Sequence, residues 1–146
     1  MTNEETFKQL IAQFGTAFDL PDLQPTPDGY CSLFADDDLA VQLQLDPQSG
    51  RVAFFIEIGT VAPEDFARVC PQLLAANALW LGTNGATLGM TTNGRVILGY
   101  HEALAQLTTE SMTKLIDDLI ITAEEWEENL VTLPGNDADP RPSAVE

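Results

Sequence analysis

Apolar residues recur at helical spacing near the start of the chain. The stripe consists of Phe7, Leu10, Ile11, Phe14 and Phe18, and this 3.6-residue period predicts an amphipathic helix. Thr2 and Glu5 stand at capping-box spacing just before it, and Leu20-Pro21 predicts its end. The stripe fits two roles, packing on a sheet or lining a groove for another chain.

Residues 30 to 58 change to the alternating pattern of half-buried strands. The sequence predicts an antiparallel meander of Tyr30–Phe34, Leu39–Leu45 and Val52–Ile58. Asp36-Asp37-Asp38 and Asp46–Gly50 are the expected turns between these strands.

A second helix is predicted from Pro63 towards Trp80, with a kink or a split at Pro71. Its second half, with Leu73, Leu74, Ala76, Leu79 and Trp80, is apolar on more than one face. Such a helix must be covered on more than one side, and a chain of 146 residues builds only a small core. A partner chain is therefore the expected cover.

A hairpin and a long last helix complete the pattern. Asn93-Gly94 predicts a two-residue turn in which both residues have positive φ. The last helix is expected to begin at Thr108 or Thr109. Its stripe is Met112, Leu115, Ile116, Leu119, Ile120, Ala123, Trp126 and Leu130.

The predicted order α-βββ-α-ββ-α defines an α+β fold with a twisted antiparallel sheet packed against helices. We expect one domain over residues 1–133. Residues 134–146 contain acidic residues and prolines but almost no apolar ones, which predicts a disordered tail.

Charge narrows the classes of partner. The chain has 23 Asp and Glu residues but 6 Lys and Arg, a net charge of −17, which disfavours nucleic acid and anionic membranes. We expect no signal peptide, and no apolar run reaches the roughly 18 to 20 residues that cross a bilayer. Cys31 and Cys70 lie in separate apolar runs, as reduced core cysteines do. We expect a soluble cytoplasmic protein.

The sequence contains no pattern typical of catalysis. His101 is the single histidine, and Asp36 to Asp38 are adjacent and therefore lack the spacing of a calcium loop. The glycines between Gly82 and Gly94 match no phosphate-binding motif. We expect no enzyme activity, no cofactor and no metal.

The chain resembles the type III secretion chaperones of the Tir-chaperone (CesT) family of Gram-negative bacteria over about residues 4 to 133. The resemblance rests on the first helix ending FGTAFDLP, the meander, LLAANALWLG, the hairpin TLGMTTNGRVILGY, the entry Leu107–Glu110 and the stretch from Glu125-Trp126 to Leu130. It implies a homodimer that binds the extended N-terminal segment of a secreted effector and so takes part in virulence. The secretion apparatus is a further partner that the resemblance allows.

The residues that fit these roles are drawn from the apolar stretches. For effector binding we name Phe7, Leu10, Ile11, Phe14, Leu33, Val41 and Leu43. For the dimer interface we name Leu73, Ala76, Asn77, Trp80 and Met90. The strands Leu39–Leu45 and Val96–Tyr100 are the candidate sheet edges to which an effector strand could add.

Two alternatives remain open at the level of sequence. One is a protein of the same fold that binds a regulator which is never secreted. The other is a small ligand-binding or enzymatic α+β domain, which a pocket with converging polar groups would indicate.

Overall fold

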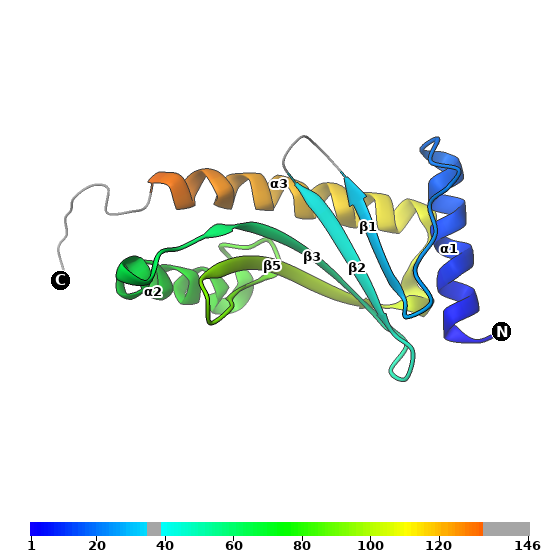
Figure 1. The fold of residues 1–146 in the computed structure, drawn as a ribbon, viewed down its shortest axis with the longest axis horizontal. Helices are drawn as coiled ribbons and strands as arrows, with labels where there is room; N and C mark the ends of the chain where they lie inside the picture. Colours follow the sequence, from blue (N-terminus) through cyan, green and yellow to red (C-terminus); the bar gives the residue numbers. More distant parts are fainter. Residues whose placement is uncertain (35–38, 133–146) are drawn as a thin grey trace. The chain divides into compact units, whose positions relative to one another are not determined.

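The computed structural model describes residues 1–34 and 39–132. Helix α1 (Asn3–Ala17) is followed by strands β1 (Tyr30–Phe34), β2 (Ala40–Asp46) and β3 (Arg51–Thr60). Helix α2 (Phe66–Asn77) lies between the 3-10 turns η1 (Pro63–Asp65) and η2 (Ala78–Trp80). Strands β4 (Thr87–Met90) and β5 (Arg95–Ala103), the turn η3 (Leu104–Gln106) and helix α3 (Thr109–Thr132) complete the chain (Figure 1). The predicted α+β fold and element order are confirmed.

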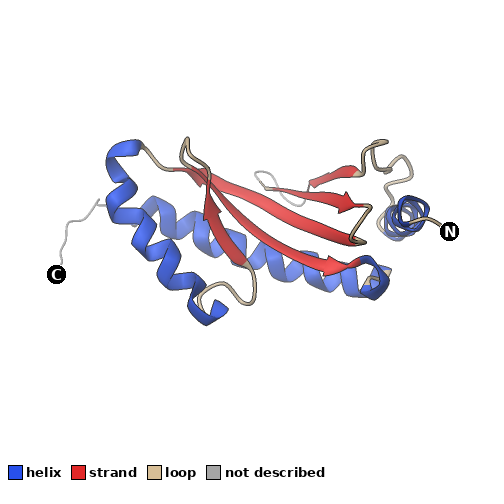
Figure 2. Ribbon diagram, turned by 90° about the horizontal axis from the view of Figure 1, so that it is seen from below, coloured by secondary structure: helices blue, strands red, loops and turns tan. Residues whose placement is uncertain are grey.

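The five strands form one sheet in the order β1-β2-β3-β5-β4. Figure 2 draws the strands in red. In the meander, Leu33 lies opposite Val41 and Leu43 opposite Phe54. The outer strands are therefore β1 and β4, and the expectation that Leu39–Leu45 and Val96–Tyr100 form edges is wrong. Strand order depends on long-range pairing, which alternation along one strand does not specify.

The chain divides into two compact units, Met1–Ile56 with Gly99–Ile120 and Glu57–Leu98 with Ile121–Glu146. Strands β3 and β5 and helix α3 each contribute residues to both. The prediction of a single domain over residues 1–133 stays a prediction. The expected turn at Asp36–Asp38 and the expected tail 134–146 lie outside the described residues.

In the first unit, the predicted capping box starts α1. The Glu5 N–H donates to Thr2 Oγ1 at 3.1 Å, and the Thr2 N–H donates to Glu5 Oε1 at 2.8 Å, so two free amides of the helix start are satisfied. The buried side chains of this unit include Phe7, Ile11, Val41, Leu43, Val52, Phe54, Ile56 and Met112.

In the second unit, α2 continues through Pro71, so a split there is wrong and the alternative, a kink, stays a prediction. Pro71 is the sixth residue of α2, and the helix instead ends at Asn77. There Leu79 and Trp80 adopt positive φ values of 56° and 55°. The side chains of Val69 and Leu73 form the buried face of α2.

The hairpin between β4 and β5 turns differently from the prediction. The Gly94 N–H donates to Thr91 O, and the Thr91 N–H donates to Arg95 O, each at 2.9 Å. Only Gly94 has positive φ, at 88°, whereas Asn93 does not. This is a three-residue loop, residues 92–94, that ends in a left-handed glycine and therefore needs positive φ at one position instead of two.

Candidate protein-binding surfaces

Strand β1 is an open edge of the sheet over its second half. At its first residue, the Thr26 N–H donates to Tyr30 O at 2.8 Å, and the Tyr30 N–H donates to Thr26 Oγ1 at 3.1 Å. Tyr30 therefore directs its backbone away from β2, and by strand alternation Ser32 and Phe34 do the same. Within residues 1–34 and 39–132, no strand pairs with this side of β1. An extended chain can add here.

Strand β4, the other edge, is occupied by a side chain. Asn77 Nδ2 donates to Leu88 O at 2.8 Å, and the Leu88 N–H donates to Asn77 Oδ1 at 2.8 Å. The amide thus makes the pair of hydrogen bonds that an added strand would make. The two edges therefore differ in their capacity to accept a strand.

A groove of about 470 Å³ lies in the first unit, beside the start of β1. The buried Phe7 and Leu45 contribute its apolar lining, and Lys8 with two glutamates contributes charge. The complete lining is Glu4, Glu5, Phe7, Lys8, Gln24, Pro25, Thr26, Pro27, Gly29 and Leu45. The apolar lining can accept an apolar side chain of a bound polypeptide. The lysine and the glutamates can face charges of either sign on that polypeptide.

The residues predicted for effector binding are all buried within this chain, namely Phe7, Leu10, Ile11, Phe14, Leu33, Val41 and Leu43. Phe7 also lines the groove, and Leu33 pairs with Val41 across β1 and β2. Their role in binding stays a prediction. The sequence analysis did not predict the outward backbone groups of Ser32 and Phe34, because side-chain patterns do not show which backbone groups remain unpaired.

The residues predicted for the dimer interface differ in exposure. Leu73 is buried, Ala76, Asn77 and Met90 are half-buried, and Trp80 is exposed. Their interface role also stays a prediction. The prediction omitted three exposed leucines that lie near Trp80 in the sequence. We call Leu74, Leu79, Trp80 and Leu81, exposed by 71, 78, 53 and 80%, the apolar turn surface.

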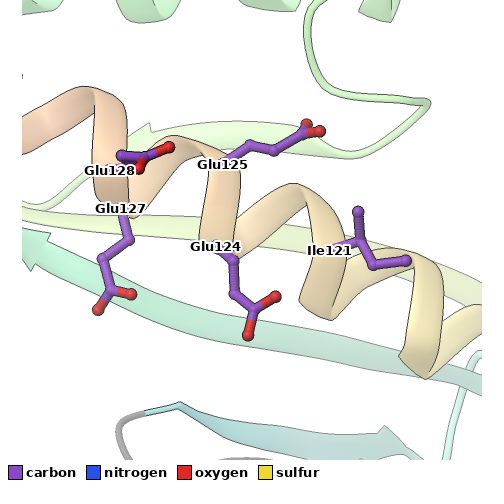
Figure 3. Close-up of a pocket in the computed structure, with 5 residues that line it drawn as sticks. All are labelled: Ile121, Glu124, Glu125, Glu127 and Glu128. Atoms are coloured by element: carbon purple, nitrogen blue, oxygen red, sulfur yellow. The ribbon is translucent and has the colours of Figure 1, made fainter.

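A shallow hollow on α3 has an acidic lining. Ile121, Glu124, Glu125, Glu127 and Glu128 line it, and all come from the same helix. Figure 3 shows that Glu124 and Glu127 point to the same side of the helix and Glu125 to the other. Among the described residues, no group of three or more His, Cys, Asp or Glu could hold a metal ion. This surface is a solvated helix face.

The side chains of His101 and Cys31 lie in different environments. Arg51 Nε donates to His101 Nδ1 at 2.7 Å on the surface. Burial raises the pKa of the Cys31 thiol, which keeps it protonated and weakly nucleophilic at neutral pH. No helix in the described part of the chain is long and apolar enough to cross a membrane.

Comparisons with known proteins give the same class. The Tir chaperone protein (CesT) family matches residues 9–127. No curated protein sequence matches the chain. Among solved structures, the ExsC-ExsE complex matches with a TM-score of 0.76 and 24% identity, over 92% of this chain and 98% of the other. The HopA1-SchA chaperone-effector complex matches with a TM-score of 0.72 and 20% identity, over 86% of this chain and 95% of the other.

A third similar structure is the Yersinia Pestis type III secretion chaperone SycH in complex with a stable fragment of YscM2. It matches with a TM-score of 0.65 and 14% identity, over 88% of this chain and 99% of the other. These likenesses confirm the fold, and the family match covers most of the chain. The chain belongs to the Tir chaperone protein (CesT) family. The predicted class, a type III secretion chaperone, is confirmed.

Proposed function

We propose that this chain binds the extended N-terminal segment of a secreted effector in the bacterial cytoplasm and keeps that segment soluble and ready for export. Membership of the family carries the proposal. One similar solved structure, HopA1-SchA, is described as a chaperone-effector complex. The act is binding alone, without catalysis, cofactor or metal.

The binding mode follows from the two sheet edges. An added strand needs backbone donors and acceptors that point outward, which the Ser32–Phe34 part of β1 provides. Asn77 already occupies the corresponding groups of Leu88 in β4. We therefore assign the effector strand to β1, with the groove that Phe7 and Leu45 line as the place for its apolar side chain. A fully buried apolar side chain contributes roughly 1.5 to 3 kcal/mol.

Capture and secretion assays in the source bacterium test this function. The tagged chain should retain a protein that the type III system exports, and removal of that protein's N-terminal segment should abolish retention. Deletion of the chaperone gene should lower export of the same protein. Retention of a partner that is never exported would contradict the proposal and favour the regulator-binding alternative.

We also propose that the protein is a homodimer through the apolar turn surface. A single chain leaves four large apolar side chains exposed there, and the resemblance implies a homodimer. Leu79→Asp should weaken the dimer, because it places a charge in the interface while aspartate tolerates positive φ better than leucine. Leu20→Asp is the matched control at an exposed leucine elsewhere. Equal dimerisation of both variants and the wild type would contradict this interface.

A further inference from the structure

The turn after α2 holds large residues in an unfavourable backbone conformation. Leu79, Trp80 and Asn84 have φ values of 56°, 55° and 54°. Positive φ is a genuine outlier for leucine and tryptophan, although asparagine adopts it more readily. Such residues persist only where their surroundings fix them, and they cluster at sites of function. Contacts with α2, β4 and α3 surround this turn and the loop after it.

Contacts to α2 and β4 hold the turn from one side. The Gly82 N–H donates to Ala76 O at 3.1 Å, and a Cβ on Gly82 would lie 3.0 Å from the Ala76 Cα. Trp80 Nε1 donates to Thr87 Oγ1 at 3.3 Å. These bonds close the end of α2 and orient the Trp80 ring.

Helix α3 holds the following loop with two hydrogen bonds. Asn84 Nδ2 donates to Thr122 Oγ1 at 2.9 Å, and Trp126 Nε1 donates to Gly82 O at 2.9 Å. Thr122 is 1% exposed, so its hydroxyl is a fixed acceptor within the second unit. We call these two bonds the latch. They join residues 38 and 44 positions apart and restrict the loop that continues the turn.

The turn presents apolar side chains on an uncharged stretch. No Asp, Glu, Lys or Arg occurs from Pro71 to Gly94, in a chain with a net charge of −17. The acidic surfaces of two copies repel each other, and this stretch adds no charge of its own to that repulsion. The four side chains offer on the order of several hundred Å² of apolar area, a substantial share of the about 800 Å² per partner in a stable interface.

We propose that the latch positions the apolar turn surface for docking with a second copy of the chain. This inference rests on the dimer proposed above. Asn84, Thr122 and Trp126 are positioning residues, because they fix the loop and need not touch the partner. A turn held in its docking conformation loses less conformational freedom on association, which strengthens binding without a new contact.

Sedimentation equilibrium of latch variants tests the proposal. Asn84→Gly removes the amide but keeps a residue that accepts positive φ, and Thr122→Val removes the hydroxyl at similar volume. Each should weaken the dimer about two- to tenfold, as expected from the loss of one hydrogen bond. Thr122→Ser keeps the hydroxyl and should dimerise as the wild type does. Thr113→Val is the matched control, since Thr113 Oγ1 donates within α3 to Thr109 O at 2.7 Å.

The outcomes separate the latch from the dimer. A wild-type protein that stays monomeric at high concentration overturns the dimer and the latch with it. A wild-type dimer with unchanged Asn84→Gly and Thr122→Val dimers overturns the latch alone. Because Thr122 is buried, Thr122→Val can unfold the protein, and then Asn84→Gly decides. A weaker Asn84→Gly dimer supports the latch where the far-UV circular dichroism matches that of the wild type.

Discussion

The side-chain amide of Asn77 pairs with the backbone of Leu88 through two hydrogen bonds of 2.8 Å. The last residue of α2 thus covers the outer edge of β4 in the way that a neighbouring strand would. A protein that binds extended polypeptide gains from this arrangement, because one edge is closed while the other accepts the partner. It also limits edge-to-edge aggregation.

Asn77→Ala should lower stability by about 1–3 kcal/mol, because it leaves a backbone donor and acceptor of Leu88 without their partner. It should also raise the tendency to aggregate through β4. Urea unfolding and light scattering measure the two effects. Asn77→Asp keeps the acceptor for the Leu88 N–H and serves as the intermediate control. A fully stable, unaggregated Asn77→Ala protein would show that the amide does not close this edge.

Substitutions of Phe7 in α1 and of Phe18 just after it should separate folding from surface packing. Phe7 is 1% exposed, and Phe7→Ala should cost about 3–5 kcal/mol. Phe18 is exposed and touches Phe14 with ring centroids 4.7 Å apart, so Phe18→Ala should cost only about 0.5–1.5 kcal/mol. Denaturant unfolding measures both. A stable Phe7→Ala protein that loses effector binding would instead assign Phe7 a role in binding and not in folding.

Three glycines allow backbone strain to be separated from steric clash. Gly94 has φ 88°, and an added Cβ would lie 2.3 Å from Val61 O. Gly85 has φ 92° with nothing within 4 Å of that position, and Gly89 has open space without positive φ. Substitution by alanine should therefore lower the free energy of unfolding by about 1–2 kcal/mol at Gly85 and by more at Gly94. At Gly89 it should change that free energy by less than about 0.5 kcal/mol. Thermal unfolding measures the ranking of the three variants. Equal destabilisation at Gly94 and Gly85 would contradict a steric clash at Gly94.

The pair Arg95 and Glu57 makes part of the stability pH-dependent. The hydrogen bond from Arg95 lowers the pKa of the Glu57 carboxyl in the folded chain. A lowered folded pKa adds stability above the unfolded pKa of about 4.3, and that stability is lost as the pH falls through the folded value. Glu57→Gln should therefore be slightly less stable than the wild type at pH 7 and equal to it in acid. Urea unfolding at both pH values checks the sign, and Arg95→Gln should show the same pH dependence as Glu57→Gln.

Local patterns in the sequence predicted the elements well. The capping box of Thr2 and Glu5 and the strand alternation both depend on neighbours along the chain, so a single sequence contains them. The start of α3 is equally local, since the Ser111 N–H donates to Thr108 Oγ1 at 3.0 Å.

The surfaces could be predicted only in part, because they depend on distant residues. The order of the strands, the pairing of Asn77 with Leu88 and the latch from Thr122 all join segments that only the fold brings together. The excess of apolar residues around Trp80 led to the prediction of a partner surface, and the structure exposes apolar side chains there. It did not indicate the positive φ of Leu79, because leucine rarely adopts that conformation.

The most direct test of the central claim is the affinity of Ser32→Pro for the N-terminal segment of the effector captured in the secretion assay. Proline removes the outward N–H of β1 but is tolerated at an edge strand, and Ser32→Ala keeps that N–H as the control. Isothermal titration calorimetry should show binding at least about tenfold weaker for Ser32→Pro and unchanged for Ser32→Ala. Equal affinity of a folded Ser32→Pro protein would contradict strand addition at β1.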